Sequence, residues 1–179
     1  LQEKFKKYTQ GTLSISSGIG IYECTYRIGA IANETGEMEA ESKRMPEKDS
    51  VTFMDDGETH LINELEICDG TYRWEELYKS VLGEKYDVIQ DFLGESDERG
   101  MSFLYRMLEL IRNQKEKINF ARFVYLLSRL EPDKEGEKKE KYRKFSRKMY
   151  QWVQSEKDCR ELKTAINLYA YMHREKGAH

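Results

Sequence analysis

Residues 11–22 read GTLSISSGIGIY, and this short stretch limits what the fold can be. Aliphatic residues alternate in it with small ones, and a period of two predicts a β-strand over 12–22. The alternating residues are Leu13, Ile15, Ile19 and Ile21. Gly11 marks the start of the strand. Gly18 within it indicates the close approach of another element, either a packed helix or a bound nucleotide.

The residues on both sides of this strand continue a mixed α/β pattern. Residues 1–8 (LQEKFKKY) read as the end of a helix, and 27–43 carry apolar residues at helical spacing. Residues 50–54 (SVTFM) predict a second strand. The Asp-Asp-Gly turn at 55–57 then precedes a strand-like 59–62, which would complete a hairpin with it.

From residue 71 onward the pattern is helical. Apolar stripes at positions i, i+3, i+4 and i+7 predict helices over 74–93, 101–112, 119–130 and 142–153. The 119–130 stripe includes Phe120. Asp158, with Glu161 three residues later, resembles a capping box at the start of a last helix. Residues 74–179 therefore predict a bundle of about five helices.

Composition excludes several classes of protein. The chain has 179 residues and a net charge of −3, which suits one ordinary domain or two small ones. Its 7 Phe, 12 Tyr and 2 Trp argue against wholesale disorder. No apolar run approaches the roughly 18 residues of a membrane span. Cys24, Cys68 and Cys159 form neither a disulfide framework nor a CxxC metal pair. We expect a soluble, cytoplasmic protein without a membrane partner.

The charge is divided unevenly along the chain. Residues 1–73 hold 8 basic and 14 acidic side chains, whereas 74–179 hold 22 and 19. This predicts a strand–helix–strand domain over 1–57, a hairpin or linker over 58–73, and a helical domain over 74–179. Two strands and one helix leave sheet edges unpaired. We therefore expect the missing strands upstream of Leu1, in a longer protein.

Three groups of residues suggest chemistry, each with a simpler alternative. Asp55-Asp56 suggests a pair of Mg²⁺ ligands, but Asp-Gly also makes turns, and adjacent strand side chains point to opposite faces. Ser16 and Gly18 suggest a surface for a nucleotide. Lys43 suggests a phosphate contact, but a cation at a helix end also stabilises the helix dipole.

The basic residues of the second half are concentrated at 134–148, where eight are basic and three acidic. Such a run suggests an RNA backbone contact. A solvated basic face explains it better, because the aromatic residues in the run fall on the apolar stripe. His60, His173 and His179 have no partner at ligand spacing, so the sequence predicts no metal site at them.

The order of elements resembles the second half of a nucleotidyl-cyclase palm, a ferredoxin-like, GGDEF-type fold that diguanylate cyclases share. In that family a strand ending in Ser-x-Gly precedes a helix with a lysine near its end. Here Ser16-Ser17-Gly18 and Lys43 occupy those places. The implied fold class is α+β, half a palm followed by an all-α bundle.

The helical segments narrow this resemblance. They read RGMSFLYRMLELIRN at 99–113, INFARFVYLLSRLE at 118–131 and INLYAYMHREK at 166–176. Together with the strand, they are similar to the C-terminal part of the large subunit of type III-A CRISPR effector (Csm) complexes. That resemblance covers nearly the whole chain.

The resemblance implies a parent protein with two activities. Its palm would join ATP into cyclic oligoadenylate when target RNA is bound, and its HD domain would cut single-stranded DNA. The catalytic GGDD and HD motifs are absent from this chain, so we expect no catalytic residue in it. Asp55-Asp56 would lie beyond the last palm strand, so we do not expect it to be the metal-binding pair of the family. ATP and a divalent metal (Mg²⁺ or Mn²⁺) would serve the parent, and this chain alone would bind neither.

By the same resemblance, Ser16, Gly18 and Lys43 would contact the nucleotide. The helical domain would meet the small helical subunits and other Csm subunits, near the guide and target RNA. The candidate contacts are Arg112, Arg122, Arg129, Lys139, Arg143 and Arg147. The alternative is a non-enzymatic helical adaptor, which explains the bundle but leaves the Ser-x-Gly strand unexplained.

Overall fold

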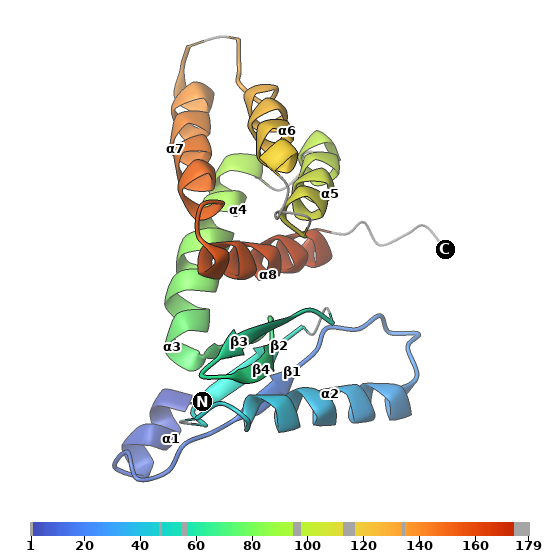
Figure 1. Cartoon of the computed structure of the whole chain (residues 1–179), viewed down its shortest axis with the longest axis vertical. Coiled ribbons are helices and arrows are strands. Elements are labelled where there is room, and N and C mark those ends of the chain that lie inside the picture. Colours follow the sequence, from blue (N-terminus) through green and yellow to red (C-terminus); the bar gives the residue numbers. More distant parts are fainter. Residues whose placement is uncertain are drawn as a thin grey trace. The chain divides into compact units, whose positions relative to one another are not determined.

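The computed structural model describes residues 2–46, 48–54, 57–94, 98–112, 117–133 and 135–173 (Figure 1). The chain divides into two compact units, Leu1–Ser80 and Val81–His179. The structure is mixed α and β, with its strands in the first unit and helices in both. Within the described residues no helix combines the length and apolarity that crossing a membrane requires.

The first unit is built on a small sheet. Strand β1 (Ser17–Ile19) pairs in parallel with β2 (Ser50–Phe53), and β2 pairs antiparallel with β5 (Thr71–Arg73). Helix α2 (Ile28–Ser42) makes the crossover between β1 and β2 and lies along one face of the sheet (Figure 1). All four residues of β2 are buried, as expected for a central strand.

Strand β1 is shorter than the predicted 12–22. Only residues 17–19 pair, because β2 presents only Val51–Phe53 opposite them. Among the described residues no strand occupies the other edge of β1. Leu13, which the alternation places in the strand, is 60% exposed. The alternating pattern in the sequence therefore extends over more residues than the three that pair with β2.

The predicted hairpin between 50–54 and 59–62 is wrong in its pairing. Strand β3 (Thr59–Ile62) pairs instead with β4 (Leu65–Cys68). The two-residue turn consists of Asn63 and Glu64, both with positive φ, the geometry that suits the twist of a hairpin. Asp55-Asp56, which were predicted to form the turn, lie outside the described residues.

The true neighbour of β2 was missed. Strand β5 falls at the end of the predicted linker, 58–73, and three residues are too few to show a period. Its pairing with β2 includes a buried hydrogen bond of 2.8 Å between the hydroxyl groups of Thr52 and Thr71. A buried hydroxyl pair stabilises only when both partners are present, so this contact specifies which strand lies beside β2.

Helix α2 has a glycine that nothing in the packing requires. A Cβ added to Gly36 would meet no atom within 4 Å, and its φ is not in the left-handed region. Because glycine costs a helix interior about 0.5–1 kcal/mol relative to alanine, Gly36→Ala is expected to raise the free energy of unfolding by about that amount. Urea unfolding followed by circular dichroism measures it; an unchanged or lower stability would contradict the expectation.

The second unit is helical. One continuous helical segment consists of α3 (Trp74–Glu76), which belongs to the first unit, the π-helix η1 (Leu77–Tyr86) and α4 (Asp87–Leu93). The remaining helices are α5 (Glu98–Arg112), α6 (Lys117–Ser128), α7 (Glu137–Trp152) and α8 (Glu156–Met172). Helix α8 contacts α4, α5 and α7 (Figure 1). These helices confirm the predicted bundle.

The core of the second unit follows the predicted stripes with one exception. Leu104, Met107, Phe145 and Ile166 are almost fully buried. Phe120 is 47% exposed, and Asn119 is buried in its place. The buried positions of α6 are Asn119, Phe123 and Leu127, which recur every four residues. The sequence stripe therefore has the correct period but a phase that is wrong by one residue at its start.

A stretch of π-helix interrupts the helix that the sequence predicts over 74–93, and its last turn carries the buried lysine Lys85, which is 2% exposed. The Lys85 ammonium lies 2.6 Å from Glu161 and 2.8 Å from Asp158, both on α8. Lys85 also lies over the ring of Trp152, 5.3 Å from its centroid. The cluster of Lys85, Asp158 and Glu161 thus joins two segments that are far apart in sequence.

The predicted capping box at Asp158 and Glu161 is wrong. Helix α8 begins earlier, and its N-cap is Ser155, whose hydroxyl accepts a hydrogen bond from the Asp158 amide at 3.3 Å. Asp158 and Glu161 lie three residues apart inside the helix and face Lys85. Their three-residue spacing is that of a capping box, but in the structure it brings both carboxylates to Lys85.

Candidate functional site

Ser16 lies one residue before β1, at the end of the sheet where β2 begins. Its hydroxyl donates a hydrogen bond to the carbonyl of Lys48, at 3.2 Å. The hydroxyl of Ser50 donates in turn to the carbonyl of Ser42, at 2.6 Å. These two bonds hold the start of β1, the start of β2 and the end of α2 together.

Gly18 is the point at which α2 approaches the sheet. A Cβ at this position would overlap the carbonyl oxygen of Thr35 and would lie 2.6 Å from the amide nitrogen of Glu39. Of the two alternatives for this glycine, the structure shows close packing against a helix. The absent side chain would point into α2, so the missing Cβ leaves no open space for a ligand on that face.

Lys43 is the C-cap residue of α2, and it follows Ser42 at the same end of the sheet as Ser16. Its ammonium forms an ion pair with Glu39, one turn earlier, and both side chains are about half exposed. Such exposed pairs contribute little to stability. The amine can therefore leave Glu39 for a phosphate at small cost.

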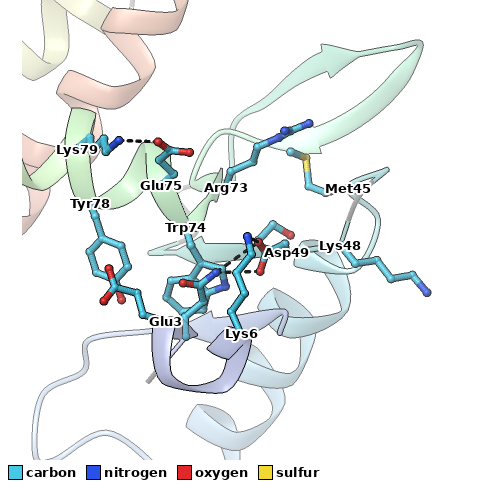
Figure 2. Close-up of a pocket in the computed structure, with 12 residues that line it drawn as sticks. Glu3, Lys6, Met45, Lys48, Asp49, Arg73, Trp74, Glu75, Tyr78 and Lys79 are labelled. Atoms are coloured by element: carbon cyan, nitrogen blue, oxygen red, sulfur yellow. Dashed lines mark hydrogen bonds and ion pairs between the residues drawn. The ribbon is translucent and has the colours of Figure 1, made fainter. Parts of the chain in front are cut away.

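A polar cavity of about 450 Å³ lies in the first unit beside this end of the sheet (Figure 2). Helix α1 (Gln2–Tyr8), the start of β2 and helix α3 contribute its walls. The indole nitrogen of Trp74 donates to the carbonyl of Ile15 at 2.8 Å, which fixes the start of α3 next to the residue before Ser16. The cavity is therefore held in place by the same strand that carries Ser16.

Charges within this cavity are largely paired. The Asp49 carboxylate accepts a hydrogen bond from the amide of Gln2 at 3.2 Å and lies 3.6 Å from the Lys6 ammonium. Lys79 lies 2.6 Å from Glu75, and this hydrogen bond lowers the pKa of Glu75 and raises that of Lys79. An anion entering here would have to compete with Asp49.

Lys48 differs from the other cations of the cavity. Its side chain extends away from Asp49 (Figure 2), and its ammonium forms no ion pair with any residue in the described part of the chain. Its backbone φ is 53°, and its carbonyl holds the Ser16 hydroxyl. The sequence analysis did not single out Lys48, and the tertiary structure places its backbone beside Ser16.

The described carboxylates of the first unit do not form a metal site. Across the described ranges, no three His, Cys, Asp or Glu side chains lie together as a metal site would require. Asp49, just before β2, is already bound to Gln2 and Lys6. The described residues therefore do not fit a divalent cation.

Most of the predicted cations on α7 are neutralised by acidic neighbours. Lys139 lies 3.0 Å from Glu135, and Arg143 lies 3.1 Å from the same carboxylate. The hydrogen bond to Lys139 lowers the pKa of Glu135 and raises that of Lys139. Lys144 pairs with Asp91 at 3.6 Å. Arg147 is exposed and forms no ion pair with a described residue.

The three arginines of α5 and α6 are exposed as predicted. Arg112 ends α5, and Arg122 lies in the middle of α6. Arg129 follows the last turn of α6, where its guanidinium lies 5.9 Å from the ring centroid of Tyr125. The sequence analysis missed Tyr125, because a tyrosine within an apolar helix reads as part of the core.

Two comparisons relate this arrangement to known proteins. The family model for the second helical domain of the Cmr2 subunit of the CRISPR RNA silencing complex matches residues 90–175. The match therefore covers α5 to α8 of the second unit.

Three curated relatives carry the name CRISPR system single-strand-specific deoxyribonuclease Cas10/Csm1 (subtype III-A). The Mycobacterium tuberculosis protein is 35% identical over 98% of this chain, and the Streptococcus thermophilus protein is 33% identical over 96%. The Enterococcus italicus protein is 35% identical over 98%. The chain spans about one fifth of the length of each relative. It therefore belongs to the Cas10/Csm1 family of subtype III-A CRISPR systems.

Proposed function

We propose that this chain is part of the large subunit of a cytoplasmic type III-A CRISPR interference complex. The parent protein would synthesise cyclic oligoadenylate from ATP when target RNA is bound, and it would also cut single-stranded DNA. The first unit would form part of the palm and support the nucleotide. The second unit would contact the small helical subunits, other Csm subunits or the guide and target RNA.

The observation that carries the nucleotide role is the convergence of Ser16, Lys43 and Lys48 at one end of the sheet. Ser16 is tied to Lys48 by its hydrogen bond, and Lys43 follows the residue that Ser50 holds. Lysine ammonium groups bind phosphate oxygens as point charges. Lys43 and Lys48 would therefore neutralise charge on the triphosphate, while Ser16 keeps the Lys48 loop in position.

Lys43→Ala in the full-length protein is expected to lower oligoadenylate synthesis while complex assembly stays intact. Loss of one charge-assisted hydrogen bond costs about 1.5–3 kcal/mol, or about tenfold or more in rate at subsaturating ATP. The measurement is product formation from labelled ATP by the complex assembled with guide and target RNA. Gel filtration of the same sample reports assembly.

Lys79→Ala is the matched control. It removes the same charge from the same unit and breaks the same kind of exposed ion pair with a glutamate one turn earlier, but it lies in η1 and not at the end of α2. Synthesis is expected to stay at the wild-type level in this variant. If Lys43→Ala also leaves synthesis unchanged at subsaturating ATP, Lys43 does not contact the phosphates.

The second candidate function is a non-enzymatic helical adaptor. It is favoured by the fact that Gly18 and Lys43 each have a structural partner, α2 and Glu39 respectively. An adaptor predicts that substitutions at Lys43 and Lys48 change neither synthesis nor DNA cleavage. The same assay therefore separates the two candidates.

A further inference from the structure

The exposed face of α6 has a different electrostatic character from that of α7. Helix α6 reads KINFARFVYLLS and contains no acidic residue. Neither Arg122 nor Arg129 forms an ion pair with a carboxylate in the ranges that the structure describes. Most cations of the longer basic run on α7 are instead paired, with Glu131, Glu135 and Asp91 among their partners, although Arg147 is not. Arg122 and Arg129 therefore both keep their charge without a described carboxylate as ion-pair partner, although the longest basic run in the sequence lies on α7.

The two arginines flank an exposed aromatic ring. Arg122, Tyr125 and Arg129 are three and four residues apart, which places them on one face of the helix within about 60°. Tyr125 is 61% exposed, and Arg129 lies over its ring. The two arginines are about 10 Å apart along the helix axis. Ala121 and Ser128, small and exposed, lie on the same side of the helix as the ring.

We infer that this α6 face, formed by Arg122, Tyr125 and Arg129, binds single-stranded nucleic acid. A base would stack on the open side of the Tyr125 ring, and the two guanidinium groups would bind phosphates on either side of it. Aromatic rings with neighbouring cations are the common means of binding single strands without sequence preference. This inference deepens the proposed function, because it assigns a nucleic-acid contact within the second unit.

A protein partner fits this face less well. Protein interfaces concentrate their binding energy in aromatic side chains that neighbouring apolar groups shield from water. Around Tyr125 the neighbours are two arginines and two small residues, and Phe120 points about 140° away around the helix. An isolated ring between two cations suits a planar base with charged phosphates better than a second apolar surface.

The test uses the whole chain and fluorescein-labelled 15-nucleotide RNA and DNA single strands, with a duplex of the same sequence. Anisotropy is measured in about 50 mM salt and at rising salt. Arg122→Gln with Arg129→Gln is expected to weaken single-strand binding at least tenfold. The negative slope of the logarithm of the association constant against the logarithm of the salt concentration is expected to decrease in magnitude by about 1.4, for two lost phosphate contacts. Tyr125→Ala is expected to weaken single-strand binding about tenfold, the effect of one lost stack. Tyr125→Phe is expected to leave the binding unchanged.

The matched control is Arg143→Gln with Lys144→Gln on α7, which removes the same charge from residues that already have acidic partners. It is expected to change the affinity less than threefold. Circular dichroism of every variant shows whether the fold is kept. Duplex binding is expected to be insensitive to Tyr125→Ala, because paired bases cannot stack on the ring.

Three results would overturn the inference. The first is absence of single-strand binding by the wild-type chain, and the second is equal loss in the α6 and α7 variants. The third is wild-type affinity after Tyr125→Ala, which would show that the Tyr125–Arg129 contact stabilises the helix and does not bind a base. None of these results affects the Lys43 assay, so failure here is distinct from failure of the proposed function.

Discussion

Lys85→Met is expected to destabilise the second unit by about 3–5 kcal/mol, the cost of breaking a buried ion pair by removing one partner. Glu161 is 1% exposed, and its Oε2 atom lies 2.6 Å from the Lys85 ammonium. Without Lys85 its carboxylate would remain buried, with an ion pair to Lys157 at 3.8 Å. Urea unfolding followed by circular dichroism at 222 nm measures the loss.

A double variant separates a lost charge pair from lost packing. Lys85→Met combined with Glu161→Met removes both buried charges and keeps similar side-chain volumes, so most of the stability is expected to return. Asp158 is partly exposed and can stay hydrated. If the double variant is as unstable as Lys85→Met alone, packing around Lys85, and not the charge of Glu161, accounts for the loss.

The pH dependence of this cluster follows from the direction of the pKa shift. Burial lowers the pKa of Lys85, but hydrogen bonds to Asp158 and Glu161 outweigh it, so the pKa lies above its ordinary value. Because the pKa of Lys85 is raised in the folded state, the cluster contributes its full stability at every pH below the pKa of the unfolded lysine, about 10.4. The contribution is lost only as the pH rises through the folded pKa.

Gly18→Ala is expected to destabilise the first unit by about 3 kcal/mol, near the upper end of the cost of overpacking. The new Cβ would lie 2.6 Å from the Glu39 amide nitrogen and 2.8 Å from the Met38 Cβ, and it would overlap the Thr35 carbonyl oxygen. Two of these obstacles are helix backbone atoms, which cannot move aside as a flexible side chain can. Chemical unfolding of the 179-residue chain measures the effect.

Gly36→Ala serves as the control for Gly18→Ala, since both add one methyl group to the first unit but the one at the exposed Gly36 meets no obstacle. The two substitutions are expected to change stability in opposite directions. Equal effects would show that α2 can shift away from β1.

Much of the fold could be predicted from local pattern. Helix periodicity identified α2 and α5 to α7 within a few residues, because an amphipathic helix carries its pattern over several turns. The strands were harder, since β1 and β5 have three residues each and their pairing is non-local. The turn at Asn63-Glu64 carried no strong signal, so β3 was paired with the wrong strand.

The candidate site was only partly accessible to sequence reasoning. Ser16 and Lys43 do lie at one end of the sheet, but Lys48 joins them through a hydrogen bond that spans 32 residues. Gly18 was correctly singled out, and its alternatives could be separated only by seeing α2 against it.

The sequence by itself determined the helical half, the strand–helix–strand order and the family, because these depend on residue types at local spacings. Only the tertiary structure decided which charges remain available. On α7, Lys141 and Lys144 meet Asp91 of α4, whereas Arg122 and Arg129 meet no described carboxylate. Lys85 finds its partner Asp158 across 73 residues. Ion pairing depends on distances set by packing, and a linear pattern of charges does not contain those distances.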